Sequence, residues 1–321
     1  MKELYVTRAL TPAAMEALKK LTDFDANTES RPATRDELIN AFKNYKAVVT
    51  RINDNIDESL INSAGENLKL IANYGVGFNN IDIKAAQRKN IFVTNTPDIL
   101  NDATADLGFC LMFAAARKIV VSDKYARSVD KFEVSPLNLF GYDITGKTLG
   151  IIGAGRIGSN FGRKAALGFS MKVIYFNNTH NSKELDEIGA TRVNNLDDVL
   201  KNSDFISLHV PLTDKTKHLI GAEEFKKMKP TAILINTARG SVVDEKALVY
   251  ALKNKIIAAA GLDVYEHEPE IDPGLKELDN VVLVPHMGSA TYETRDNMGF
   301  MVAKNVEAVL KGLTPPNLVR V

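Results

Sequence analysis

One stretch of the sequence decides the fold: Lys147-Thr148-Leu149-Gly150-Ile151-Ile152-Gly153-Ala154-Gly155-Arg156-Ile157-Gly158. Its first half is an apolar run typical of a buried β-strand, and a helical pattern over 156–167 follows at once. Between them stands the pattern Gly-x-Gly-x-x-Gly. Gly153 permits a tight turn, Gly155 lets the backbone approach a pyrophosphate, and Gly158 lets the helix pack closely on the strand. The stretch therefore predicts a dinucleotide held at a helix N-terminus.

Outward from this stretch, short runs rich in Val and Ile alternate with longer amphipathic stretches. The alternation is typical of βαβ units and predicts an α/β protein with parallel sheets. On the C-terminal side we predict six strands, the number of a complete doubly wound domain, at 148–152, 172–176, 205–209, 232–236, 258–262 and 281–284. Before it we predict four strands near 3–7, 47–50, 68–72 and 91–94, a helix after Thr11-Pro12, a long helix over 102–121 and an irregular stretch over 128–146.

The length of 321 residues predicts two domains, because it exceeds what one hydrophobic core usually organises. We assign 101–287 to a Rossmann dinucleotide-binding domain and 1–100 plus 288–321 to a substrate domain. A final helix near 290–311 lies beyond the sixth strand, so we expect it to return to the first domain. The predicted fold is thus α/β, with two doubly wound parallel-sheet domains, Rossmann-like or flavodoxin-like, and the nucleotide domain inserted into the substrate domain.

The composition argues against several partners. Forty basic residues balance forty acidic ones, so no overall charge attracts nucleic acid or an anionic membrane. The single cysteine, Cys110, lies in the apolar run 107–116, and we predict that it is a buried core residue. A lone cysteine excludes an intramolecular disulfide and suits a reducing compartment. With no signal-peptide pattern or bilayer-spanning run, we expect a soluble cytoplasmic enzyme.

The choice of cofactor depends on the end of the second strand of the dinucleotide domain. An acidic residue there usually accepts hydrogen bonds from the adenosine ribose. Here the sequence has the amides Asn177 and Asn178, which neither repel a 2′-phosphate as a carboxylate does nor attract it as an arginine does. We predict that NAD is preferred, with measurable use of NADP.

Three charged or titratable residues follow separate predicted strands: Arg239, Glu268 and His286. The carboxyl ends of parallel strands share the edge that carries the ligand crevice and the glycine turn. The three residue types suit reduction of a 2-oxo acid. Arginine binds a carboxylate and polarises a keto oxygen, histidine donates the proton, and glutamate orients the histidine. The nicotinamide supplies the hydride.

The other histidines, His180, His209, His218 and His267, have no metal-ligand spacing, and only one cysteine is available. We therefore predict no metal site, and a zinc-dependent alcohol dehydrogenase is disfavoured.

Several motifs together resemble the D-isomer-specific 2-hydroxyacid dehydrogenase family over nearly the whole chain. The motifs are Asn73-Tyr74-Gly75-Val76-Gly77-Phe78-Asn79-Asn80-Ile81-Asp82, 146–153, His209-Val210-Pro211-Leu212-Thr213, Asn236-Thr237-Ala238-Arg239-Gly240, 260–269 and Pro285-His286-Met287-Gly288-Ser289-Ala290-Thr291. Glu268 differs from the amide of the formate dehydrogenase branch. The Tyr74–Asp82 segment looks most like that of glyoxylate or hydroxypyruvate reductases.

The resemblance implies a catalytic triad of Arg239, Glu268 and His286, a cleft between two domains, and a homodimer built largely through the nucleotide domains. It implies that backbone N–H groups of Val76 and Gly77 bind the substrate carboxylate. It also implies further cofactor contacts, which we assign to Arg156, Ile157, Val210, Pro211, Thr237, Ala238, Asp263 and Gly288, with Asp263 on the nicotinamide carboxamide.

Arg51 follows the predicted strand 47–50, where a second positive charge would favour a substrate with an extra anionic group. A surface arginine is the alternative. Two other functions also remain open on this fold: a non-enzymatic, corepressor-like NAD(H) sensor, and a dehydrogenase of another anion such as phosphite. Activity on a small 2-oxo acid distinguishes them.

Overall fold

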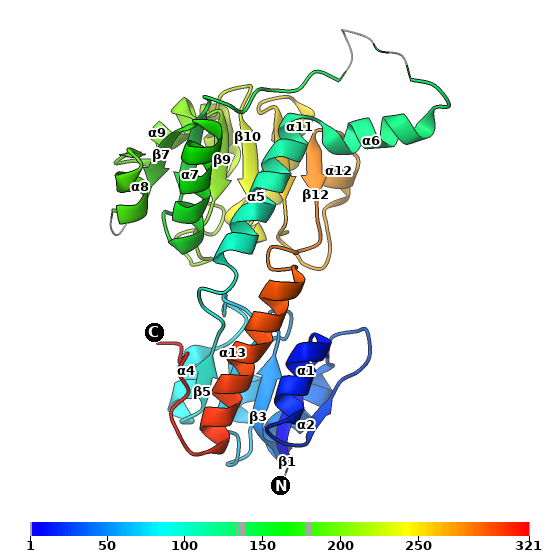
Figure 1. Ribbon diagram of the computed structural model, residues 1–321, viewed down its shortest axis with the longest axis vertical. Helices are drawn as coiled ribbons and strands as arrows, with labels where there is room; N and C mark the ends of the chain where they lie inside the picture. The colour runs from blue at the N-terminus through cyan, green and yellow to red at the C-terminus, as the bar shows by residue number, and fades with distance from the viewer. Residues whose placement is uncertain (1, 133, 135–138, 178–180, 321) are drawn as a thin grey trace. The chain divides into compact units, whose positions relative to one another are not determined.

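The computed structural model of the chain describes residues 2–132, 134, 139–177 and 181–320. The chain forms two compact units (Figure 1). The first consists of Met1–Leu100 together with Ser289–Val321, and the second of Asn101–Gly288.

The first unit has a five-stranded, wholly parallel sheet in the order β2-β1-β3-β4-β5, which is the flavodoxin-like order. The strands are β1 (Lys2–Val6), β2 (Phe24–Ala26), β3 (Tyr45–Thr50), β4 (Leu70–Asn73) and β5 (Phe92–Thr94). The four predicted strands are confirmed. The three-residue edge strand β2 was missed because Phe24-Asp25-Ala26 is too short to show a periodicity.

Helices cover both faces of this sheet. On one face α2, α3 and α4 contribute to a continuous core, and on the other α13 packs against α1, β3 and β4. The helices are α1 (Pro12–Lys19), α2 (Arg35–Asn44), α3 (Glu58–Asn62), α4 (Ile83–Arg88) and α13 (Tyr292–Leu310). Local sequence sets their starts: Thr11 caps α1, and Thr34 with Glu37 forms a capping box at α2.

The second unit has a seven-stranded parallel sheet in the order β12-β11-β10-β9-β6-β7-β8. The order reverses beside β6, as in a dinucleotide-binding fold. The strands are β6 (Thr148–Ile152), β7 (Lys172–Phe176), β8 (Thr191–Arg192), β9 (Phe205–Leu208), β10 (Ile233–Asn236), β11 (Ala259–Leu262) and β12 (Val281–Leu283). The six predicted strands are present, and β8 is an additional edge strand that the sequence analysis missed.

Two hydrophobic clusters cover the two faces of this second sheet. One includes residues of α5, α7 and α8, and the other residues of α9, α10, α11 and α12. The helices of the unit are α5 (Asn101–Ala116), α6 (Ile119–Ser128), α7 (Arg156–Phe169), α8 (Lys183–Glu187), α9 (Leu196–Asn202), α10 (Ala222–Lys227), α11 (Glu245–Lys253) and α12 (Pro273–Lys276), with a short 3-10 helix at Gly240–Val242.

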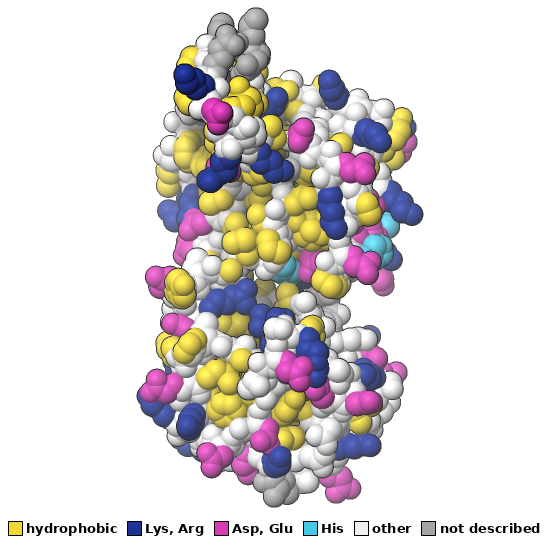
Figure 2. Space-filling view, turned by 90° about the vertical axis from the view of Figure 1, so that its right-hand side faces the viewer, with side chains coloured by type: hydrophobic (Ala, Val, Ile, Leu, Met, Phe, Trp, Pro, Cys, Tyr) yellow, Lys and Arg dark blue, Asp and Glu magenta, His cyan; other side chains and the backbone are white. Residues whose placement is uncertain are grey.

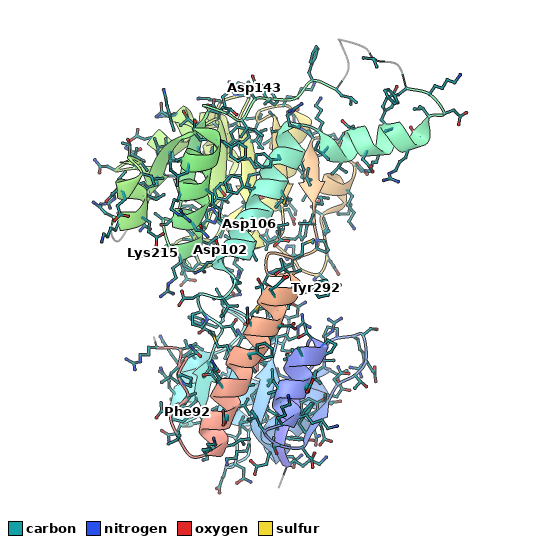
Figure 3. All side chains as sticks on the ribbon, in the orientation of Figure 1. Phe92, Asp102, Asp106, Asp143, Lys215 and Tyr292 are labelled. Carbon is teal, nitrogen blue, oxygen red and sulfur yellow. The ribbon has the colours of Figure 1, made fainter. Side chains whose placement is uncertain are left out.

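Two predictions for the region after residue 101 are wrong. The single helix over 102–121 is two helices, because Lys118 adopts a left-handed conformation with φ of 51° and ends the run between α5 and α6. Cys110 is exposed rather than buried. It lies four residues after Asp106 and eight after Asp102, so helical periodicity places it on the solvent side of α5 with these two acids (Figure 3).

Among the described residues, no helix is both long and apolar enough to cross a bilayer.

Candidate active site

The glycine-rich turn joins β6 to α7. Gly153 has φ of 98°, and a Cβ there would lie 2.8 Å from the carbonyl carbon of His209. A Cβ on Gly158 would lie 2.2 Å from the Gly153 carbonyl oxygen, so helix and strand pack too closely for a side chain. Gly155, in contrast, faces open space and is the N-cap of α7. The turn therefore leaves room for an anion beside the first backbone N–H groups of the helix.

The next loop in the sheet follows β9 and carries Val210 and Pro211. A Cβ on Gly153 would lie 2.8 Å from the Val210 Cγ1 atom, so this loop contacts the glycine turn, while Pro211 is exposed. His209 Nε2 lies 2.8 Å from the Ser207 hydroxyl, and burial lowers the pKa of His209 to about 3. The imidazole of His209 is thus neutral at pH 7 and adds no charge beside the turn.

The loop after β10 contains a buried polar atom for which the described residues provide no partner. The Thr237 Oγ1 atom has no hydrogen-bond partner within the described parts of the chain. The neighbouring Ala238 N–H donates to Asn236 Oδ1 at 3.0 Å. A buried hydroxyl is usually hydrogen-bonded, so Thr237 fits a position that a bound cofactor would satisfy.

Two other groups of predicted cofactor contacts lie at the start of α7 and directly after β7. Arg156, which begins α7, is exposed, and Ile157 packs against the core on the α5 side. Asn177 directly follows β7, and its carbonyl accepts a hydrogen bond from Arg192 Nη2 at 2.9 Å. Asn178 lies outside the described residues. Sequence analysis missed Arg192 because β8, which carries it, has no apolar run.

The loops after β11 and β12 bring two predicted catalytic residues together. The His286 Nδ1 atom lies 2.7 Å from Glu268 Oε2, and Glu268 Oε1 accepts the Tyr265 N–H at 3.0 Å. Their side chains are 29% and 26% exposed. Burial favours the neutral form of Glu268, but the hydrogen bond and charge of His286 outweigh it, so the pKa of Glu268 is lowered. Glu268 is therefore a carboxylate that orients the imidazole, and His286 Nε2 has no partner among the described side chains.

Arg239, the third predicted catalytic residue, begins the turn after β10. Its Nη1 donates to the Ala238 carbonyl at 2.6 Å. Burial lowers the pKa of Arg239, and the negative charge of Glu268 opposes that shift. A Cβ on Gly240 would lie 1.8 Å from the Tyr265 carbonyl carbon, so this turn packs directly on the loop that leads to Glu268. The fold thus brings all three predicted catalytic residues to one edge of the sheet.

Asp263, at the end of β11, is buried and fixes the turn that carries His286. Its two carboxylate oxygens accept the backbone N–H groups of Met287 at 2.6 Å and Gly288 at 2.9 Å. The Gly288 carbonyl in turn accepts the Thr104 hydroxyl at 3.2 Å. Burial raises the pKa of Asp263 to about 6. His286 itself has φ of 51°, so these contacts hold an otherwise disfavoured backbone conformation. The sequence did not reveal this role for Asp263.

In the first unit, Arg51 follows β3. Its N–H donates to Asp54 Oδ2 at 2.8 Å, and its guanidinium lies 5.9 Å from the centre of the Tyr74 ring. Arg295 lies at the same distance from that ring. Burial lowers the pKa of Arg51, and the positive charges of Arg295 and Arg8 add to this effect. The negative charge of Asp54 opposes this shift. In the described part of the structure, the Arg51 guanidinium itself forms no hydrogen bond or ion pair.

The predicted carboxylate-binding loop after β4 is held by its carbonyl groups. Asn73 Nδ2 donates to the Gly77 carbonyl and Asn95 Nδ2 to the Val76 carbonyl, each at 2.8 Å. The backbone N–H groups of Val76 and Gly77 have no acceptor among the residues described. A loop with its carbonyls occupied and its N–H groups available suits an anion.

The described residues include no group of three or more His, Cys, Asp or Glu that could hold a metal ion.

The glycine turn follows β6, and the loops that carry Glu268 and His286 follow β11 and β12 of the same parallel sheet. This arrangement is typical of one class of protein, the dinucleotide-binding oxidoreductases. Comparison with known proteins makes the class narrower. Residues 109–288 match the family described as "D-isomer specific 2-hydroxyacid dehydrogenase, NAD binding domain".

Relatives cover almost the whole chain. A glyoxylate reductase of Thermococcus litoralis is 48% identical over 321 residues, which is 99% of this chain and 96% of that protein. A crystal structure of a glyoxylate reductase from Paecilomyes thermophila is 33% identical with a TM-score of 0.87, over 99% of this chain and 98% of that one. The NADPH-dependent glyoxylate/hydroxypyruvate reductase of Sinorhizobium meliloti, in complex with NADP and malonate, is 29% identical with a TM-score of 0.84, over 99% and 96%.

The chain belongs to the D-isomer-specific 2-hydroxyacid dehydrogenase family, as its motifs indicated. It is an NAD(P)-dependent oxidoreductase of 2-hydroxy acids.

Proposed function

We propose that this enzyme reduces a small 2-oxo acid to the D-2-hydroxy acid, with glyoxylate and hydroxypyruvate as the first candidate substrates. One observation carries the assignment of roles: the 2.7 Å contact between His286 Nδ1 and Glu268 Oε2, on loops adjoining the turn that holds Arg239. The pair leaves His286 Nε2 as the nitrogen available to a substrate. The names of the relatives favour glyoxylate and hydroxypyruvate over larger acids.

In the proposed mechanism, each of the three residues performs one step of positioning or proton transfer. Arg239 binds the substrate carboxylate and polarises the keto oxygen. His286 donates its Nε2 proton to that oxygen during reduction and accepts it during oxidation. Glu268 contacts Nδ1 and orients the imidazole for the transfer. When bound, the nicotinamide cofactor supplies or accepts the hydride.

The cofactor-binding role of the second unit rests on its shape and on one unsatisfied group. The open space at Gly155 suits a pyrophosphate, and the buried Thr237 hydroxyl lacks a partner among the described residues. Asp263 would bind the carboxamide with the remaining lone pairs of its carboxylate, because each oxygen already accepts one backbone N–H. The proposal keeps the other cofactor contacts predicted from the sequence, among them Gly153, Gly158 and Val210.

The first unit would bind the anionic end of the substrate. The available N–H groups of Val76 and Gly77 suit one carboxylate. Arg51, whose guanidinium forms no ion pair with a described residue, would favour a second anionic group.

An assay of substrates separates this proposal from the two alternatives. Oxidation of NADH and NADPH is followed with glyoxylate, hydroxypyruvate, pyruvate and oxaloacetate, and the chirality of each chiral product is determined. We expect turnover of glyoxylate or hydroxypyruvate, with D products. Turnover of phosphite with NAD and of none of these acids would identify a phosphite-type dehydrogenase. Cofactor binding without turnover of any of them would identify a sensor.

We also propose that the enzyme is a homodimer, because α6 is a helix without a buried residue. The segment from α6 to residue 142 exposes large apolar side chains: Ile119 is 54%, Phe132 66% and Phe140 64% exposed. Figure 2, which faces the side on which α6 lies in Figure 1, shows hydrophobic side chains gathered on this unit. A helix normally buries one apolar face, so a second copy of the chain would cover this segment.

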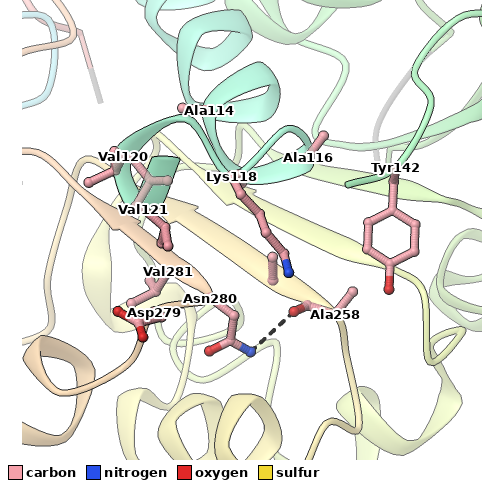
Figure 4. Close-up of a pocket in the computed structure, with 13 residues that line it drawn as sticks. Ala114, Ala116, Lys118, Val120, Val121, Tyr142, Ala258, Asp279, Asn280 and Val281 are labelled. Atoms are coloured by element: carbon pink, nitrogen blue, oxygen red, sulfur yellow. Dashed lines mark hydrogen bonds between the residues drawn. The ribbon is translucent and has the colours of Figure 1, made fainter. Parts of the chain in front are cut away.

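A pocket at the start of α6 extends the same apolar surface (Figure 4). It lies between the C-terminal end of α5, the first turn of α6 and the strands β11 and β12. Its lining includes Ala116, Val121, Tyr142 and Val281. Its floor is fixed by Asn280 Nδ2, which donates to the Ala258 carbonyl at 3.1 Å.

Light scattering tests the dimer. We expect the wild type to have about twice the 35.2 kDa mass of one chain, and the double variant Ile119→Glu, Tyr125→Glu to be monomeric. Tyr250→Glu, which changes an aromatic residue on α11 that is 61% exposed against 37% for Tyr125, should remain dimeric. A monomeric wild type would contradict the proposal.

A cytoplasmic location is proposed on the basis of Cys110. It is a free, exposed thiol, which suits a reducing compartment. Fractionation of the cells that produce the enzyme tests this.

A further inference from the structure

The edge strand β8 places an arginine at the ribose end of the nucleotide site. β8 pairs in parallel with β7, with Arg192 opposite Tyr175. From there the Arg192 side chain reaches the carboxyl end of β7. Its Nη1 donates to Asn181 Oδ1 at 2.7 Å and its Nη2 to the Asn177 carbonyl at 2.9 Å. The guanidinium is therefore held against the loop that follows the second strand of the dinucleotide fold.

In dinucleotide-binding folds, NAD and NADP are distinguished at this position. In dinucleotide-binding folds the residue that ends the second strand meets the adenosine ribose, where a carboxylate repels a 2′-phosphate and a nearby arginine accommodates it. Here β7 leads into Asn177, which has no charge. Asp186 is an acidic residue near Tyr175, and its Oδ1 atom accepts a hydrogen bond from the Tyr175 hydroxyl at 2.6 Å.

The charge of Arg192 is available for a ligand. Its two hydrogen-bond partners among the described residues are neutral, one a backbone carbonyl and the other a side-chain amide, and it forms no ion pair with any of those residues. Its side chain is exposed. A planar guanidinium binds a phosphate through paired N–H donors, and the two loop contacts hold this one in place beforehand.

We propose that Arg192 binds the 2′-phosphate of NADP(H), so that the enzyme uses NADPH as well as NADH. The inference rests on the proposed cofactor site at the glycine turn. It names the residue that compensates for the uncharged Asn177: the positive charge that the sequence lacks after β7 comes from the neighbouring strand.

Binding measured without turnover tests this inference. NADH and NADPH are titrated into the enzyme and the fluorescence of the reduced nicotinamide is followed, since the chain contains no tryptophan. Arg192→Ala should weaken NADPH about tenfold, the loss of a charge-assisted hydrogen bond to phosphate, and change NADH less than about twofold. Added salt should weaken NADPH binding to the wild type more than to the variant.

Two further variants make the result specific. Arg192→Gln keeps a neutral donor for the loop, and we expect the same selective loss of NADPH affinity. Lys172→Ala removes an exposed positive charge from the opposite end of β7 and should leave both affinities unchanged. Equal weakening of NADH and NADPH in both Arg192 variants, or no change in either, would overturn the inference.

The outcome is distinct from that of the proposed function. If the Arg192 variants lose NADPH selectively but no 2-oxo acid is reduced, the substrate proposal fails and this one stands. If 2-oxo acids are reduced and the affinities do not respond to Arg192, only this inference fails.

Discussion

The two regions to which we assign the chemistry differ in how far their polar groups are satisfied. In the second unit, Glu268 contacts both His286 and the Tyr265 N–H, and Asp263 holds the turn of His286. In the first unit, the Arg51 guanidinium and the N–H groups of the 76–77 loop have no acceptor among the described residues. In the proposed mechanism, the first arrangement transfers a proton and the second binds an anion. Substitutions should therefore destabilise the former and stabilise the latter.

The largest effect is expected for His286→Asn. Asparagine removes the group that donates the proton, so kcat should fall about a thousandfold, in the range of general acid catalysis. Affinity for NADH, measured by fluorescence titration, should stay within about twofold because the glycine turn is untouched. The control is His267→Asn, an exposed histidine next to Glu268, which should keep wild-type kcat. A His286→Asn variant with near-wild-type kcat/KM would remove His286 from the mechanism.

A smaller loss of activity is expected for Glu268→Gln. Glutamine keeps one hydrogen-bond acceptor but not the negative charge beside His286, which orients the imidazole and stabilises the transition state, so kcat should fall about a hundredfold.

The difference in stability between the wild type and Glu268→Gln should depend on pH. The pKa of Glu268 is lowered in the folded enzyme from an ordinary value of 4.5, so its carboxylate stabilises the fold above pH 4.5, and this contribution is lost as the pH falls below that value. Urea unfolding of the wild type should therefore show an advantage over Glu268→Gln at pH 7 that shrinks towards pH 3. An advantage that grows on acidification would show that the sign is wrong.

Arg51→Gln should have the smallest effect on turnover and the opposite effect on stability. Removal of a partly buried positive charge that forms no ion pair with a described residue should raise the free energy of unfolding by about 1 kcal/mol. It should lower kcat/KM about tenfold for a 2-oxo acid with a second carboxylate, such as oxaloacetate, and less for glyoxylate.

Arg35→Gln provides the matched control in the same unit, because Arg35 pairs with Asp57 at 2.7 Å. It should not gain stability. If Arg51→Gln leaves kcat/KM unchanged for every acid tested, Arg51 is a surface arginine and the comparison between the two regions fails on the side of the first unit.

The sequence predicted well whatever depends on buried periodicity or on glycine geometry. The apolar runs gave the long parallel strands, and Gly153 and Gly158 sit where close backbone contacts exclude a Cβ. The positions of Arg239, Glu268 and His286 after three strands followed from the rule that parallel strands end at one edge.

What was missed depends on contacts between distant segments. β8 has only two residues, both exposed, so no pattern marks it, and the place of Arg192 beside Asn177 is set by strand pairing. The left-handed Lys118 and the exposed Cys110 lie in a run that is apolar on most sides, where periodicity gives little indication of the solvent face. The role of Asp263 as the support of the His286 turn could not be predicted, because it depends on how the loop after β12 folds back onto Asp263.

The central claim is that a hydride moves from the nicotinamide to the keto carbon of a 2-oxo acid while His286 supplies the proton. The most direct test uses NADH with deuterium at both positions of nicotinamide C4 and glyoxylate as the acceptor, with the product analysed by mass spectrometry. The account predicts glycolate with one deuterium on carbon 2 from the wild type, and almost none formed by His286→Asn. Failure to form glycolate, or glycolate without deuterium, would contradict it.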